Sequence, residues 1–146
     1  MTDLADCALR GPVDPLLLRD ELLAEIFAAS ARRRPDHPAI VFEGETISYA
    51  ELDARADRVA RALQVRGIGR GQFVGLWMTR SADLHVGLLG ILKSGAAYIP
   101  FDADAPADRI AECLEDCAAP AIVVDATTAA KAGARLPAAM LGLSEL

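Results

Sequence analysis

Few residues in this 146-residue sequence have the types and spacing that chemistry requires. Asp102 and Asp104 form an acidic pair that could in principle hold a metal ion. They lie on a short loop bounded by two prolines, however, and carboxylates on such loops more often form a turn and cap the following helix. We therefore interpret the pair as structural and predict no metal site.

The histidines and cysteines are equally isolated. His37 and His85 have no partner at catalytic spacing, and we interpret both as structural. Cys7, Cys113 and Cys117 show no C-x-x-C spacing, and no histidine lies at ligand spacing from the last two, which argues against a zinc site. We expect the cysteines to be small buried hydrophobes in a reducing cytoplasm.

The sequence contains no G-x-x-x-x-G-K-[ST] phosphate loop, no G-x-S-x-G elbow, no H-E-x-x-H motif and no EF-hand loop. The run Gly67–Gly71 has the spacing G-x-G-x-G and follows a predicted helix. A dinucleotide fingerprint has the spacing G-x-G-x-x-G and follows a strand. The run therefore predicts a helix stop and a turn, and the residues alone indicate no catalytic residue, cofactor ligand or metal ligand.

Composition disfavours two classes of partner. Lysine and arginine total 15 against 21 aspartates and glutamates, and the net charge of −6 argues against nucleic acid, because phosphate binding needs a concentrated basic face. The one basic cluster, Arg32–Arg34, lies at the end of a predicted helix, where it complements the helix dipole. The N-terminus does not have a signal-peptide pattern, and the longest apolar run, Leu84–Leu92, is too short to span a bilayer. We expect no membrane partner and a cytoplasmic location.

The elements that would position these residues alternate between helices and strands. Apolar residues at helical spacing, among them Leu22 and Leu23, predict a first helix over residues 16–34. Ser48 and Glu51 form a capping box, in which the Ser48 hydroxyl accepts from the Glu51 amide and the Glu51 carboxylate reaches back. The predicted order is a flexible arm (1–15), the first helix (16–34), a hairpin turning at Glu43–Glu45 (39–49), a helix that stops near 66–67, a strand (73–78), a helix capped by Ser81 (81–94), a strand (96–100), a helix (107–117), a strand (120–125), a weak helix (126–135) and the start of a strand (138–141).

This alternation predicts an α/β fold: part of a doubly wound, mostly parallel sheet with flanking helices, preceded by an N-terminal helix and a β-hairpin. Lys93 lies in the last turn of its helix, where a cation suits the dipole, and Gly95 is the expected left-handed stop. The strand over residues 96–100 is apolar throughout, and we predict that it is fully buried. In the helix that follows, Cys117 should face the core.

Two ordered motifs carry a family resemblance. Residues 47–52 read I-S-Y-A-E-L, and residues 92–102 read L-K-S-G-A-A-Y-I-P-F-D, followed by P-A-D-R-I over residues 106–110. This pattern resembles the core motifs of the adenylate-forming enzymes, specifically the amino-acid adenylation domains of nonribosomal peptide synthetases. The resemblance implies structural roles for the motif residues, which are Ser48, Tyr49, Glu51, Leu52, Leu92, Lys93, Gly95, Ala97, Tyr98, Pro100, Asp102, Pro106 and Arg109.

In that family an amino acid is joined to the α-phosphate of ATP with Mg²⁺, and the aminoacyl group passes to the phosphopantetheine thiol of a carrier protein. The family's phosphate loop, ribose-binding motif and catalytic lysine do not occur in this sequence. The resemblance therefore implies that residues 16–146 are the N-terminal part of an AMP-binding (adenylation) domain, truncated before the phosphate loop, with the rest of that domain as partner. We expect the chain alone to bind no cofactor, to be inactive, and to fold poorly because its sheet ends on an unpaired edge.

Alternatives stay open at this stage. An acyl-CoA or fatty-acyl-AMP ligase fragment would share the chemistry, although Tyr98, Asp102 and Arg109 favour the amino-acid branch. A non-catalytic interaction module or remnant domain would be a different class of protein. A flavodoxin-like binding domain is disfavoured, because the strand ends lack a phosphate-cradling loop.

Overall fold

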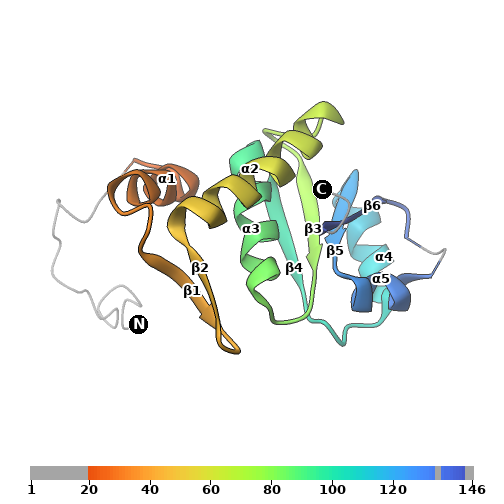
Figure 1. The fold of residues 1–146 in the computed structure, drawn as a ribbon. Coiled ribbons are helices and arrows are strands. Elements are labelled where there is room, and N and C mark those ends of the chain that lie inside the picture. Colours follow the sequence, from red (N-terminus) through yellow and green to blue (C-terminus); the bar gives the residue numbers. More distant parts are fainter. Residues whose placement is uncertain (1–19, 134–135, 144–146) are drawn as a thin grey trace, which may run out of the picture.

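The computed structural model describes residues 20–133 and 136–143. The elements are α1 (Leu23–Arg33), β1 (Pro38–Phe42), β2 (Glu45–Ser48), α2 (Tyr49–Val65), β3 (Phe73–Trp77), α3 (Ala82–Ser94), β4 (Ala97–Phe101), α4 (Ala107–Asp116), β5 (Ala121–Val124), α5 (Ala126–Ala132) and β6 (Ala139–Gly142) (Figure 1). Their order and types confirm the α/β fold predicted from the sequence. No helix of this described part is long and apolar enough to cross a bilayer.

The first helix begins later than predicted. The Glu25 carboxylate accepts a hydrogen bond from the Leu22 amide at 2.9 Å, and α1 starts at the next residue, Leu23. Leu22 and Leu23 are each 66% exposed, so the prediction that they lie on a buried face is wrong. Burial begins further along α1, at Ala31. The rest of the predicted helix start and the predicted arm, over residues 1–19, lie outside the described residues.

The hairpin of β1 and β2 is antiparallel and has a two-residue turn. Phe42 pairs with Glu45, and only Glu43 and Gly44 lie between them, with φ of 50° and 86°. Positive φ at both positions is the turn geometry that matches the twist of the flanking strands. The predicted turn was one residue too long, since Glu45 belongs to β2.

The other four strands form a parallel sheet in the order β4-β3-β5-β6. Alternate residues of its central strands enter two separate cores. Leu76 and Val123 join the core shared with α2 and α3, whereas Trp77 and Ile122 join the core shared with α4 and α5. Helices therefore cover both faces of the sheet (Figure 1), which confirms the doubly wound arrangement.

The strand β4 lies at the edge of this sheet, and within the described residues it pairs with β3 alone. Ala97 and Pro100 are exposed, so the prediction that residues 96–100 form a fully buried strand is wrong. Pro100 has no N–H to donate, and such a residue is tolerated at a sheet edge. The fully buried strand is β5, which has neighbours on both sides.

Three of the described helices end in a left-handed residue. α2 and α3 stop at Gly67 and Gly95, with φ of 73° and 92°, as predicted. α4 stops in the same way at Ala118, with φ of 47°. Cys117 precedes it as an exposed residue at the end of α4, so the prediction that Cys117 faces the core is wrong.

Candidate functional site

The first motif, residues 47–52, joins the hairpin to α2. Ser48 is the N-cap of α2, and its hydroxyl accepts a hydrogen bond from the Glu51 amide at 3.2 Å, which confirms half of the predicted capping box. The other half is wrong, because the Glu51 carboxylate pairs with Arg55 one turn further along the helix. Leu52 is buried in the core beneath α2.

Tyr49 of this motif connects the start of α2 to α1 and to the loop between α1 and β1. Its ring centroid lies 5.8 Å from that of Phe27 on α1. Its amide donates to the His37 carbonyl at 3.0 Å, and the Ala50 amide donates to the Pro35 carbonyl at 2.9 Å. The first N–H groups of α2, which have no partner inside the helix, are thus satisfied by the loop between α1 and β1.

Lys93 of the second motif joins α3 to α2. Its Nζ lies 2.6 Å from Asp53 Oδ1 and also contacts Asp57 Oδ1, and its side chain is only 12% exposed. Burial disfavours the charged ammonium, but the hydrogen bonds and the attraction of both carboxylates outweigh burial and hold the pKa of Lys93 above its ordinary value. Its neighbours in the motif, Leu92 and Tyr98, are half-buried.

The loop after β4 contains the acidic pair. Asp102 Oδ1 accepts a hydrogen bond from the Asp104 amide at 3.1 Å, which confirms the predicted turn. The Asp104 carboxylate lies 2.9 Å from Lys131 Nζ on α5. The predicted cap is wrong: Pro106 occupies the N-cap of α4, and no side chain caps that helix. Arg109 is exposed in the first turns of α4.

The ends of the adjacent strands β3 and β5 are joined by a polar network that the sequence analysis missed. Asp125 Oδ2 accepts hydrogen bonds from both the amide and the hydroxyl of Thr79, each at 2.6 Å. Asp125 Oδ1 accepts from the Thr128 amide at 2.8 Å, and the buried Thr128 hydroxyl donates to the Trp77 carbonyl at 2.7 Å. The spacing of Asp125 and Thr128 in the sequence is that of a helix cap, but nothing in it indicates Thr79.

Burial of the Asp125 carboxylate favours its neutral form, but the hydrogen bonds from Thr79 and Thr128 prevail and hold its pKa below the ordinary value. The network lies between the two strands whose connecting helices leave toward opposite faces of the sheet. Ligands of doubly wound folds bind in this crevice. Here the side chains of Asp125, Thr79 and Thr128 lie at this position and bond to one another and to the backbone.

These residues do not fit the ATP and Mg²⁺ that the resemblance implies for a complete enzyme. At the ends of β3 and β5, both carboxylate oxygens of Asp125 already accept hydrogen bonds from this chain's own donors. Within residues 20–133 and 136–143, no group of three or more histidine, cysteine, aspartate or glutamate side chains could hold a metal ion. We therefore derive no step of a reaction through either group.

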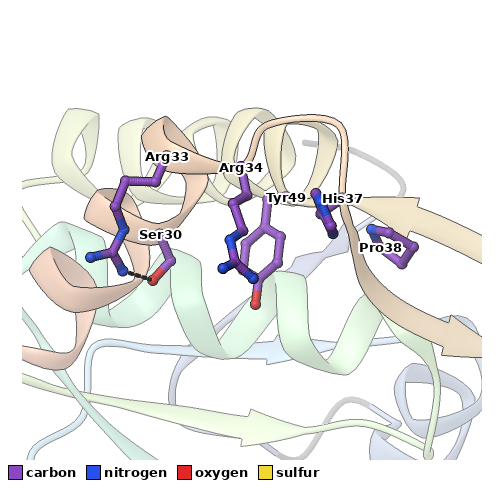
Figure 2. Close-up of a pocket in the computed structure, with 6 residues that line it drawn as sticks. All are labelled: Ser30, Arg33, Arg34, His37, Pro38 and Tyr49. Atoms are coloured by element: carbon purple, nitrogen blue, oxygen red, sulfur yellow. Dashed lines mark hydrogen bonds between the residues drawn. The ribbon is translucent and has the colours of Figure 1, made fainter.

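Two of the cavities in the described part of the chain are each lined by a tyrosine of the motifs. The first, of about 540 Å³, opens at the ends of β3 and β4 and is lined mainly by apolar side chains, together with Arg80, Asp102 and Asp104. The second, of about 220 Å³, lies where the end of α1 meets the start of α2 (Figure 2). Its lining is polar and consists of Ser30, Arg33, Arg34, His37, Pro38 and Tyr49.

The remaining candidate residues do not come together. His37 lines the smaller cavity, whereas His85 is exposed in the first turn of α3, where its Nδ1 lies 3.3 Å from a carbonyl one turn back. Cys113 is half-buried and Cys117 exposed, and both are free, so the expectation of buried cysteines fails at Cys117. Cys7 lies outside the described residues.

The chain has an N-terminal helix and a hairpin packed against a doubly wound parallel sheet, and its motif residues hold helices together. These features define a scaffold of the adenylate-forming class. Residues 27–143 match the family described as AMP-binding enzyme, and the chain belongs to that family. Within the family, it corresponds to the N-terminal portion of an adenylation domain of the nonribosomal peptide synthetase type.

The curated relatives are long enzymes. The chain is 46% identical over 111 residues to the delta-poly-L-ornithine synthetase of Acinetobacter baumannii (strain AB307-0294), covering 76% of this chain and 8% of that protein. It is 51% identical over 108 residues to the dimodular nonribosomal peptide synthase of Bacillus subtilis (strain 168), covering 74% of this chain and 4% of that protein. The chain thus spans less than a tenth of either relative.

Solved structures agree in fold. The nonribosomal peptide synthetase FmoA3 in its α-methyl-L-serine-AMP bound form superposes with a TM-score of 0.81 and 32% identity, over 90% of this chain and 15% of that chain. The N-terminal subdomain of Klebsiella oxytoca NpsA superposes with a TM-score of 0.71 and 26% identity, over 86% of this chain and 30% of that chain. The chain therefore has the fold of part of such a subdomain.

Proposed function

We propose that this chain works as the N-terminal part of an adenylation domain, whose complete form activates an amino acid as aminoacyl-AMP for nonribosomal peptide synthesis. The match of residues 27–143 to AMP-binding enzymes, with synthetases as relatives, carries the proposal. The FmoA3 structure, which is bound to α-methyl-L-serine-AMP, supports an amino acid as the substrate class. The fused adenylation-PCP structure NpsA-ThdA supports a carrier protein as partner.

In this proposal, residues 16–146 supply scaffold and the rest of the domain supplies the chemistry. Ser48 starts α2, Lys93 joins α3 to α2, and Asp125 joins β3 to β5. The contacts of these side chains are with this chain's own groups, which supports a structural role for the motif residues. ATP and Mg²⁺ then bind to the rest of the domain, and the location is cytoplasmic.

Amino-acid-dependent ATP–pyrophosphate exchange tests the proposal. The 146-residue chain alone should give no exchange above a no-enzyme blank with any of the twenty amino acids. A chimera should give exchange: residues 27–143 would replace the matching segment of an adenylation domain from the Bacillus subtilis dimodular synthase, which is 51% identical over 108 residues. The chimera should keep that domain's amino-acid preference, because the segment contributes scaffold only.

The matched control is a chimera that also carries Gly90→Val, which places a side chain inside the packed interface of α2 and α3. This control should lose exchange together with the folded domain. Exchange by the chain alone, or a folded chimera with altered amino-acid preference, would show that these residues do more than scaffold the domain.

A further inference from the structure

The smaller cavity has a lining that matches a negatively charged ligand. Arg33 and Arg34 come from the end of α1, His37 from the following loop and Tyr49 from the first turn of α2. Figure 2 shows the guanidinium groups of Arg33 and Arg34 and the Tyr49 hydroxyl pointing to the same side. Each of these side chains can donate hydrogen bonds, and a guanidinium presents its donors in a planar fork that suits the oxygens of a phosphate.

Among the described residues, no carboxylate lines this cavity. Asp36 is in the same loop but is not part of the lining. Neither arginine forms an ion pair with a carboxylate of the described residues, although the sequence has 21 acidic residues and 15 basic ones. With the described residues, the side chain of Arg33 makes one hydrogen bond, to the Ser30 hydroxyl at 3.2 Å, and most of its donors have no partner among them.

The backbone around the cavity is held by hydrogen bonds. The His37 amide donates to the Arg34 carbonyl at 3.2 Å, and the His37 carbonyl accepts from the Tyr49 amide at 3.0 Å. The half-buried Tyr49 ring also packs on Phe27. The backbone that carries the lining side chains is therefore fixed before a ligand arrives, which lowers the entropy that binding must overcome.

The size of the cavity decides which anion it fits. Its volume of about 220 Å³ is below the roughly 300–1,000 Å³ of cavities that bind whole organic ligands. A nucleotide exceeds this volume, whereas a single tetrahedral oxyanion does not. We propose that Arg33, Arg34, His37 and Tyr49 form a binding site for a phosphate group, either inorganic phosphate or the phosphate of a small monoester. The site is separate from the adenylation chemistry and does not depend on the proposed function.

The test is a titration of the 146-residue chain with inorganic phosphate, followed by amide NMR at constant ionic strength. Phosphate should shift the amides of Arg34, His37 and Tyr49 in a saturable way, and sodium chloride at equal ionic strength should not. Glycerol 3-phosphate forms the second arm and separates the two sources. Shifts with both ligands indicate a site open to monoesters, and shifts with phosphate alone indicate a site for the free ion.

The double variant Arg33→Gln/Arg34→Gln should weaken phosphate binding by at least about tenfold, since charge-assisted hydrogen bonds are lost. The matched control Arg58→Gln/Arg61→Gln removes two exposed arginines from α2 and should change the affinity less than twofold. If the isolated chain gives no dispersed spectrum, the same variants are compared in the adenylation-domain chimera by the rise in melting temperature with phosphate. Phosphate effects that are absent, or equal in both double variants, would overturn the proposal.

Discussion

Lys93 Nζ lies 2.6 Å from Asp53 Oδ1, although the two residues are 40 positions apart in the chain. The contact crosses from α3 to α2, where Asp57 completes the group. Asp53 and Asp57 are one helical turn apart and would repel each other without the ammonium between them. Lys93 therefore stabilises the contact between the two helices. It also offsets the repulsion between Asp53 and Asp57 within α2.

We expect Lys93→Met to lower the free energy of unfolding by about 1 kcal/mol, a figure kept small because the two carboxylates are 30% and 45% exposed and water screens them. The control Lys131→Met breaks the ion pair with Asp104, which is 92% exposed, and should change stability by less than about 0.5 kcal/mol. Urea unfolding can be followed by the fluorescence of Trp77, the single tryptophan, which is fully buried. Equal losses in both variants would contradict the prediction.

The same contact gives stability a dependence on alkaline pH. Because the folded pKa of Lys93 is raised above its ordinary value of 10.5, its contribution is fully present below pH 10.5 and is lost as the pH rises through the raised value. We expect the stability difference between the chain and Lys93→Met to be constant from pH 7 to 10 and to shrink above that range. A difference that already shrinks below pH 9 would argue against the assignment.

The contribution of Asp125 to stability should depend on acidic rather than alkaline pH. Its pKa is lowered from the ordinary 3.8, so its contribution is present above pH 3.8 and is lost as the pH falls through the lowered value. Asp125→Ala should lower the free energy of unfolding by about 2 kcal/mol, since it removes a helix cap and leaves the Thr79 and Thr128 donors without their acceptor. Equilibrium unfolding at pH 7 measures this loss.

Asp125→Asn keeps the shape of the side chain and separates charge from geometry. Its free energy of unfolding should fall less steeply between pH 4 and pH 2 than that of the unmodified chain, because it has no carboxylate to protonate at this site. Asp104→Asn is the control, since that carboxylate is almost fully exposed, and its acid unfolding should match that of the unmodified chain. If Asp125→Asn shows an unchanged acid transition, the network does not set the stability at low pH.

Ala118 occupies the position at the end of α4 that Gly67 occupies at the end of α2. In each case the residue has positive φ, and the residue after it closes the helix end: Ala119 N bonds Leu114 O at 2.9 Å, and Ile68 N bonds Leu63 O at 3.0 Å. Ala118→Gly should therefore stabilise the chain by about 1 kcal/mol, because glycine adopts this conformation without a Cβ clash. Gly67→Ala should destabilise it by a similar amount, and thermal melts of both variants give the comparison.

The local features of the fold were predictable because they depend on residues close together in the chain. Ser48 and Ser81 as caps, Gly67 and Gly95 as stops, and the alternation of helices and strands all follow from spacing of a few residues. The resemblance to adenylation domains likewise rests on short motifs. These predictions needed no knowledge of which element lies beside which.

Some local predictions failed too, among them the length of the hairpin turn and the Glu51 half of the capping box. The other failures concern contacts between distant elements. An apolar strand looks the same at the centre and at the edge of a sheet, so the sequence could not place β4 at the edge. The pairing of Lys93 with Asp53 depends on the crossing of α2 and α3, and that of Thr79 with Asp125 joins residues 46 positions apart. The phosphate site is of the same kind: Arg34 and Tyr49 meet because backbone bonds fold the intervening segment back, which no local pattern indicates.

The crossing of α2 and α3 depends on a glycine that no motif rule singled out. A Cβ placed on Gly90 would lie 2.4 Å from Val59 Cβ and 3.1 Å from the Ala56 carbonyl oxygen, so two helix backbones would have to separate. Gly87 lies one turn earlier, and a Cβ there would meet the tips of flexible side chains, the closest of them Leu76 and Met78 at 3.2 Å. The two glycines therefore form a pair on one helix that differs in the kind of neighbour and in how closely that neighbour lies.

We expect Gly90→Ala to destabilise the chain by about 3 kcal/mol, at the upper end for overpacking, since the atoms it meets belong to the β-carbon and backbone of a neighbouring helix. Gly87→Ala should lose about 1 kcal/mol or less, because Leu76 and Met78 can change rotamer and alanine favours a helix over glycine. Val59→Ala keeps Cβ but removes the methyl group that a new Cβ would meet at 2.5 Å, so the double variant Val59→Ala/Gly90→Ala should lose less than the sum of its single variants. Urea unfolding of the four proteins decides between two locations of the strain. A shortfall of about 1 kcal/mol or more would place it at the Val59 methyl group, whereas strict additivity would place it at Val59 Cβ and the Ala56 carbonyl, which the double variant keeps.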